Sequence, residues 1–191
     1  PNILFLVVDD LKPNIGPYGD PIARTPAFDR IAASGVTFMN NYCQFPLSGP
    51  TRASVLTGLQ PDHTGVWTLD GIFRRNNPEI VSLPQLFAAH GYETVGIGKV
   101  YHPLSDETYN NDPVSWTKPY IKPQAPVYML PEGKPVTECV DVPDNAYFDG
   151  RVADEAVAWI DSLSRSDKPF FLAVGFIRPH LPFVAPEKYW D

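Results

Sequence analysis

The stretch NILFLVV at residues 2–8, followed directly by Asp9 and Asp10, decides the predicted fold. A continuous apolar run that is rich in branched residues is typical of a β-strand buried on both faces, as in a parallel sheet. The two acidic residues end the run abruptly and mark the carboxyl end of this strand. We therefore expect a first buried strand within an α/β domain.

Helical patterns alternate with further apolar runs along the chain. One of the predicted helices opens with the Ser82/Gln85 spacing of a capping box and closes on Gly91. The predicted helices are residues 25–35, 82–91 and 148–163, and the strands predicted to follow them are residues 36–40, 92–98 and 169–175. This alternation favours an α/β fold with a mostly parallel sheet between helices.

Residues 101–147 interrupt the alternation with a proline-rich stretch that has no convincing periodicity. A loop of that length is usually functional or disordered. Its aromatic residues Trp116, Tyr120 and Tyr128 favour an ordered lid or the wall of a substrate subsite over a disordered linker.

The composition is ordinary for a globular protein with one substantial core, with 191 residues of which 43% are hydrophobic. The net charge of −7 argues against a nucleic-acid-binding surface. The longest apolar run is too short to cross a bilayer, and no signal peptide is present.

Cys43 and Cys139 match no zinc pattern and suit either a disulfide or two thiols. Both ends of the chain look trimmed, so we expect a longer protein.

The segment PLSGPTRASVLTG, residues 46–58, predicts a helix with Ser48 or Gly49 near its cap and Pro50 in its first turn. Plain capping explains these features but not Arg52, because the first turn already carries positive partial charge from the helix dipole. Free N–H groups together with a guanidinium suit an anion such as phosphate or sulfate, which Ser48 would face.

Polar side chains follow three of the predicted strands. In open α/β sheets the ligand crevice lies beyond the carboxyl ends of the strands, and the start of the 48–58 helix can face the same edge. The residues that follow the strands are Asp9 and Asp10, then Lys99 and His102, and finally Arg178 and His180. We expect these side chains to converge on one site.

Asp9 and Asp10 are predicted ligands of calcium or magnesium. Adjacent carboxylates repel each other unless a cation lies between them, and hard cations prefer oxygen ligands. The alternative is that the two acids form a turn or a helix cap at the exit of the strand.

The basic residues also have structural interpretations. Lys99 could be a surface lysine, which is the commoner fate of lysines. His102 and His180 each lie near a proline and could be loop residues satisfied by the backbone. His63, in a turn, and His90, at a predicted helix end, are interpreted as structural.

Four motifs, in this order, resemble a known family: VVDD at residues 7–10, SGPTRASVLTG at 48–58, GKVYHP at 98–103 and RPHLPF at 178–183. They resemble the type I sulfatases of the alkaline phosphatase superfamily, and among these the group of iduronate-2-sulfatase and its bacterial relatives. The resemblance runs along essentially the whole chain. It implies an alkaline-phosphatase-like α/β fold and hydrolysis of a sulfate ester of a sulfated carbohydrate.

The resemblance also implies a modified nucleophile. In the family the residue at the position of Ser48 is oxidised to formylglycine, whose hydrate attacks sulfur and releases the sugar alcohol. Collapse of the covalent intermediate then frees sulfate. By the same resemblance, Asp9, Asp10 and modified Ser48 would hold calcium, with magnesium as the alternative.

Roles for the other residues come from the same resemblance. Arg52 and Lys99 would stabilise the formylglycine hydrate and the sulfate. His102 would assist the collapse, and His180 would contact the sulfate or protonate the leaving oxygen.

Serine at position 48 marks the bacterial serine type, since many relatives carry cysteine there. Cys43 is therefore not the modified residue. A formylglycine-generating maturation enzyme is an implied partner, and it would recognise the context of Pro50 and Arg52.

The family completes its metal site with an Asp and an Asn or His, and its sulfate clamp with another lysine, from a later segment. Residues 1–191 are therefore predicted to be the N-terminal portion of a single catalytic domain, completed by the rest of the protein. The resemblance implies a periplasmic or secreted enzyme, with a 2-O-sulfated uronic acid as one candidate substrate. The alternatives are a metal-dependent phosphoesterase that uses unmodified Ser48 and an inactive relative that binds sulfated glycans.

Overall fold

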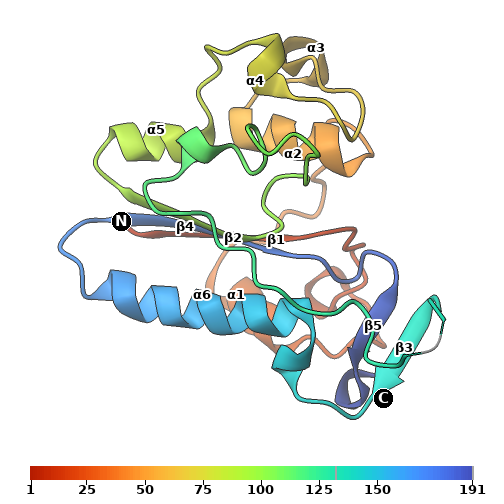
Figure 1. Cartoon of the computed structure of the whole chain (residues 1–191). Coiled ribbons are helices and arrows are strands. Elements are labelled where there is room, and N and C mark those ends of the chain that lie inside the picture. Colours follow the sequence, from red (N-terminus) through yellow and green to blue (C-terminus); the bar gives the residue numbers. More distant parts are fainter. Residues whose placement is uncertain (132, 191) are drawn as a thin grey trace.

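A parallel sheet of three strands lies at the centre of the computed structural model, which describes residues 1–131 and 133–190 (Figure 1). The order is β1-β4-β2, with β1 at Ile3–Val8, β4 at Phe170–Phe176 and β2 at Glu93–Gly98. The register aligns Val8 with Phe176 and Gly98 with Gly175, so the three strands end at one edge. The α/β fold with a parallel sheet is confirmed, as are the predicted strands at 2–8, 92–98 and 169–175.

The central strand β4 divides the core into two layers, because its side chains alternate between the two faces of the sheet. Phe171 packs into one cluster together with Leu56 of α2 (Ser48–Thr57). Leu172 packs into the other cluster with Val152 of α6 (Phe148–Ser164). Figure 1 shows α6 on one side of the sheet, and α2 and α5 (Leu83–Ala89) on the other.

The helix ends follow their sequence signals. Helix α5 opens with the predicted capping box, in which the Ser82 hydroxyl accepts from the Gln85 N–H and the Gln85 side chain accepts from the Ser82 N–H. The other helices are α1 (Pro26–Ser34), α3 (Pro61–Thr64), α4 (Phe73–Asn76) and the 3-10 helices η1 (Gly16–Tyr18), η2 (Pro113–Ser115), η3 (Asp144–Ala146) and η4 (Glu187–Tyr189). Within the described residues, no helix is long and apolar enough to cross a membrane.

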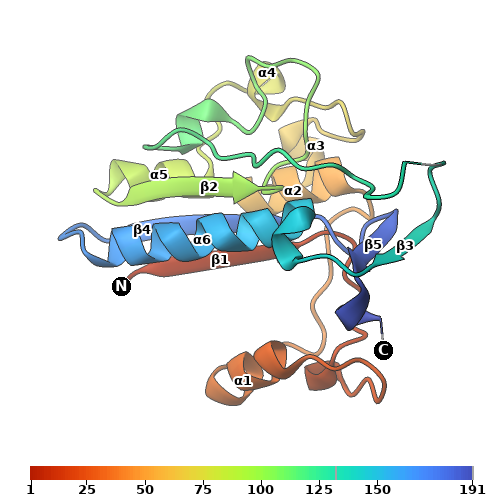
Figure 2. The ribbon, with the colours of Figure 1, turned by 60° about the horizontal axis from the view of Figure 1, so that its bottom comes forward.

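The strand predicted at residues 36–40 is wrong. Val36, Phe38 and Met39 are 79%, 68% and 62% exposed, and the segment carries no strand assignment. The preceding helix α1 buries none of its residues and stands away from the sheet (Figure 2). Alternating apolar residues form a strand only beside a neighbouring strand, and this segment pairs with none in the described part of the chain.

The segment 101–147 has more regular structure than predicted. It contains β3 (Thr137–Val140), which pairs in parallel with β5 (Phe183–Pro186) in a second, two-stranded sheet. Trp116 and Tyr120 are not a lid, because both pack against the core cluster that contains Phe171. A Cβ on Gly96 would lie 2.4 Å from the Tyr120 ring, so glycine permits this close approach.

Candidate active site

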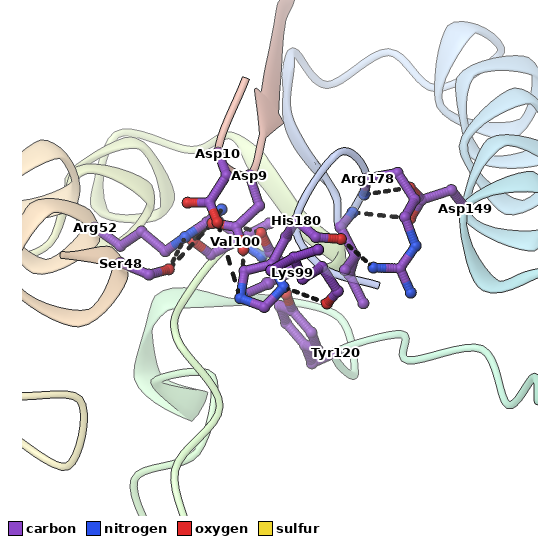
Figure 3. Close-up of polar contacts among 12 residues, drawn as sticks. Asp9, Asp10, Ser48, Arg52, Lys99, Val100, Tyr120, Asp149, Arg178 and His180 are labelled. Carbon is purple, nitrogen blue, oxygen red and sulfur yellow. Dashed lines mark hydrogen bonds and ion pairs between the residues drawn. The ribbon is translucent and has the colours of Figure 1, made fainter. Parts of the chain in front are cut away.

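The polar residues predicted from the sequence converge where the parallel strands end. Asp9 follows β1, Lys99 follows β2, and Ser48 and Arg52 lie in the first turns of α2. Figure 3 shows their side chains pointing toward one another. We call Asp9, Asp10, Ser48, Arg52 and Lys99 the Asp9 cluster.

Ser48 does not cap its helix. It is the first residue of α2, and the N-cap residue, Leu47, makes no side-chain capping bond. The Ser48 hydroxyl donates instead to Asp9 Oδ1 at 3.1 Å and accepts from Arg52 Nε at 3.1 Å. The interpretation of this serine as a plain cap is therefore wrong, and its oxygen belongs to the Asp9 cluster.

Asp9 is the centre of the cluster and is only 4% exposed. Arg52 Nη2 lies 2.7 Å from one carboxylate oxygen, and Lys99 Nζ pairs with the other. Burial alone would raise the pKa of Asp9, but the hydrogen bonds and charges of Lys99 and Arg52 outweigh it and hold that pKa below its usual value. Asp9 is therefore ionised at neutral pH, with two cations beside it.

Arg52 links three elements of the site. Besides its contacts to Asp9 and Ser48, its Nη1 donates to the carbonyl oxygen of Val100 at 2.9 Å and to that of Lys99. The cation that is unfavourable in a first helical turn is thus compensated by the Asp9 carboxylate and by the carbonyl groups that follow β2.

Asp10 completes a group of possible metal ligands. Its backbone is left-handed, with φ of 55°, and its carboxylate is exposed. One ligand atom each from Asp9, Asp10 and His180 lies within 4.8 Å of the others. Two carboxylates beside a hydroxyl oxygen form a donor set that suits a hard cation such as calcium or magnesium. The residues present therefore fit the predicted metal.

His180 is a loop residue with a hydrogen bond to the backbone, as its structural interpretation predicted, and it also joins this group. Its Nδ1 donates to the Leu181 carbonyl oxygen at 2.7 Å, because a carbonyl can only accept. Its Nε2 lies 3.9 Å from Asp10 Oδ2. Because Nδ1 is bound to this carbonyl, Nε2 is the ring nitrogen that faces the two carboxylates.

His102 lies on the other flank of the cluster, after β2. Burial is the main cause that lowers its pKa below the usual value, and the positive charge of Lys99 adds to the effect. Its Nδ1 is buried and has no hydrogen-bond partner in the part of the chain that the structure describes. The neutral imidazole is therefore the form favoured at neutral pH, and it is able to accept a proton.

Two residues that position the site were missed by sequence reasoning. The Tyr120 hydroxyl donates to Gly98 O at 2.8 Å and accepts from Val100 N at 3.1 Å, bracketing Lys99. The Asp149 carboxylate, in the first turn of α6, accepts from the backbone N–H groups of Ile177 and Arg178. An acid in a first helical turn was a signal for Asp149, but it indicates a helix start and not this loop contact.

His63 and His90 lie outside the site, in agreement with their structural interpretation. His63 is in α3, and His90 ends α5 with its ring nitrogen 2.8 Å from the Leu86 carbonyl oxygen.

A groove of about 750 Å³ opens beside the Asp9 cluster and continues along β1, where Phe5 and Val7 line it. A ligand can therefore reach Ser48 from solvent.

The fold and the cluster together define an α/β protein with a charged site at the carboxyl edge of its parallel sheet. The family model described as Sulfatase matches residues 1–191, and the chain belongs to the sulfatase family. The resemblance predicted from the four motifs is thereby confirmed.

Individual relatives agree with this assignment. The chain is 35% identical to iduronate 2-sulfatase of Mus musculus, an alignment that covers 98% of this chain and 36% of that protein. A solved 2-O GAG sulfatase matches with 28% identity and a TM-score of 0.68, over 94% of this chain and 35% of that one. A protein solved with its substrate D-glucosamine-2-N,6-O-disulfate matches with 28% identity and a TM-score of 0.69, over the same shares. The chain thus spans about a third of the length of these relatives.

Proposed function

We propose that the full-length protein is a sulfatase that hydrolyses a sulfate ester of a sulfated glycan, with residue 48 as the nucleophile. The observation that carries the proposal is the position of the Ser48 oxygen, 3.1 Å from both Asp9 Oδ1 and Arg52 Nε at a helix N-terminus. A nucleophile between carboxylates that fit a metal and cations that fit an oxyanion suits attack on an anionic ester. The glycan part of the proposal rests on the printed names of the relatives, which include iduronate 2-sulfatase and a 2-O GAG sulfatase.

The proposed metal is calcium, with magnesium as the alternative, held by Asp9, Asp10 and the oxygen of residue 48. When bound, the ion polarises a sulfate oxygen and favours ionisation of the nucleophile. Calcium takes about six to eight oxygen ligands. We propose that ligands from the rest of the protein complete the set.

Ser48 is proposed to act as formylglycine. A maturation enzyme that supplies the oxidant would remove two hydrogens from the CH₂OH group, and water would add to the resulting aldehyde. The helix N-terminus and Arg52 lie where they stabilise negative charge on the oxygen of residue 48. Lys99, paired with the other oxygen of Asp9, brings a second cation for the sulfate.

The two histidines are proposed to move protons. His180, protonated at both ring nitrogens, donates its Nε2 proton to the sugar oxygen as the bond from that oxygen to sulfur breaks and the bond from residue 48 to sulfur forms, and the proton lost by the attacking hydroxyl replaces the proton that His180 gave up. His102, favoured in its neutral form, accepts the proton of the remaining hydroxyl as sulfate leaves and the aldehyde returns. The sum is sulfate ester plus water giving alcohol plus hydrogen sulfate.

Peptide mass spectrometry across residue 48 tests the proposal, on protein from its native source or co-expressed with a serine-type maturation enzyme. We expect a peptide lighter by two hydrogens that reacts with an aldehyde probe. Sulfate release from an aryl sulfate should be lost in Ser48→Ala. The control for folding is Ser54→Ala, a change at a serine of the same helix, and it should keep this activity. Unmodified serine together with faster release of phosphate than of sulfate from matched aryl esters would support the phosphoesterase alternative instead.

Export to the periplasm or out of the cell belongs to the same proposal and rests on the family resemblance. Fractionation of the native cells, with sulfatase activity measured in each fraction, tests it. Activity confined to the cytoplasmic fraction would contradict it.

A further inference from the structure

Arg178 is a half-buried cation outside the Asp9 cluster. It follows β4, and Figure 3 shows it on the opposite side of His180 from Ser48. Its Nη1 donates to the carbonyl oxygen of His180. Among the described residues no carboxylate forms an ion pair with Arg178, whereas Arg52 and Lys99 are both paired.

The acid near Arg178 is already engaged with the backbone. Asp149 accepts from the N–H groups of Ile177 at 2.8 Å and of Arg178 at 2.7 Å. Burial raises the pKa of Asp149 above its usual value, and burial lowers the pKa of Arg178, which remains charged because arginine does not deprotonate in proteins. The nearby charge of Asp149 partly offsets the effect of burial on Arg178 but forms no ion pair with it, so this half-buried guanidinium has capacity for an anion.

A cavity of about 180 Å³ adjoins this guanidinium. Its walls include Arg178, Asp149 and Tyr147, and the proline-rich segment 122–127 closes it with Lys122. Arg178 and Lys122 are thus the two basic residues that line the cavity, and its one acidic lining residue, Asp149, is bound to two N–H groups. The charge of the cavity favours an anionic ligand.

We infer that this cavity is a subsite for a second anionic group of the substrate, a carboxylate or a second sulfate, which Arg178 binds. The inference rests on the proposed function. Arg178 lies two residues before His180, and His180 Nε2 lies 3.9 Å from Asp10 Oδ2, so one loop carries a residue at the Asp9 cluster and a residue that lines the cavity. A planar guanidinium matches both oxyanions with two parallel hydrogen bonds.

The test uses the full-length, matured protein and pairs of substrates that differ by one negative charge. One pair is a 2-O-sulfated uronide and its methyl ester, and the other is glucosamine-2-N,6-O-disulfate and N-acetylglucosamine 6-O-sulfate. We expect the wild type to prefer the more anionic member of one pair. Arg178→Gln should lower kcat/KM for that member by about 10- to 100-fold more than for its partner, as expected for a charge-assisted bidentate contact. Arg178→Lys should restore part of the preference.

Arg165→Gln is the matched control, because Arg165 is an exposed arginine at the end of α6 that forms its ion pair with Asp161. It should leave the substrate preference unchanged. The pair that responds to Arg178→Gln shows whether the anion is a carboxylate or a sulfate. An equal loss on both members of both pairs would mean that Arg178 only positions His180, and it would overturn the inference.

Binding is measured in parallel by titration calorimetry with desulfated uronate, its methyl ester, glucosamine N-sulfate and N-acetylglucosamine, none of which requires turnover. If the wild type cleaves no ester but binds an anionic member more tightly than its partner, and Arg178→Gln abolishes the difference, the subsite stands and the proposed function fails. If the wild type binds each anionic ligand no better than its uncharged partner, the subsite is wrong.

Discussion

Replacing Tyr120 with phenylalanine tests how the structure positions Lys99. The Tyr120 hydroxyl donates to Gly98 O at 2.8 Å and accepts from Val100 N at 3.1 Å, so it fixes the backbone on both sides of the lysine. Burial raises the pKa of Tyr120 above its usual value, so the hydroxyl keeps its proton and remains a donor. Phenylalanine preserves the ring that packs on Gly96 and removes both hydrogen bonds.

The expected loss follows from these two bonds. The loss of each bond leaves a backbone group without this partner, and a buried unsatisfied group costs about 1–3 kcal/mol, so we expect a destabilisation of about 2–6 kcal/mol. Because the end of β2 would also loosen, kcat/KM for sulfate release should fall more than binding of sulfate does. Both are measured on the full-length protein, by urea denaturation and by steady-state kinetics.

Tyr128→Phe is the matched control. The Tyr128 hydroxyl makes one exposed bond, to Pro135 O at 3.1 Å, so its loss should cost less than about 0.5 kcal/mol, as for other surface substitutions. If Tyr120→Phe and Tyr128→Phe cost the same, the reasoning about Lys99 is refuted.

Two further changes test the packing and the proton chemistry. Gly96→Ala places a Cβ 2.4 Å from the Tyr120 ring and should destabilise the protein by about 1–3 kcal/mol in thermal or urea denaturation, and a wild-type stability would contradict the close approach. Burial holds the pKa of His102 below its usual value, so its neutral form should persist at neutral pH. The fall of kcat on the acid side should begin only as the pH drops through that lowered pKa, and a pH profile of His102→Gln should lack this acid limb.

The sheet could be predicted from the sequence because its signals are local. Residues 2–8 and 169–175 are continuous apolar runs, and the Ser82/Gln85 box marks its helix by a fixed spacing. The prediction for residues 36–40 failed because alternation shows only that a strand could form, and not whether another strand lies beside it. The same limit hid β3, whose partner β5 lies more than forty residues later along the chain.

The residues of the candidate site could be predicted from the sequence, but the contacts between their side chains could not. Strand ends and a helix start were enough to bring Asp9, Ser48 and Lys99 to one edge. That Asp9 binds both cations, or that Tyr120 brackets Lys99, depends on side-chain directions across three separate elements. No local spacing in the sequence encodes such contacts.

The burial of helix α2 sets an order of events in the cell. Pro50 is almost fully enclosed and Arg52 is 5% exposed, so the folded domain hides the residues that a maturation enzyme is proposed to recognise. Oxidation of Ser48 would then compete in time with folding, and a chain that folds first would keep its serine. The fraction of active molecules would be fixed during synthesis, by the supply of the maturation enzyme relative to the rate of folding, and adding that enzyme to folded protein would not raise it.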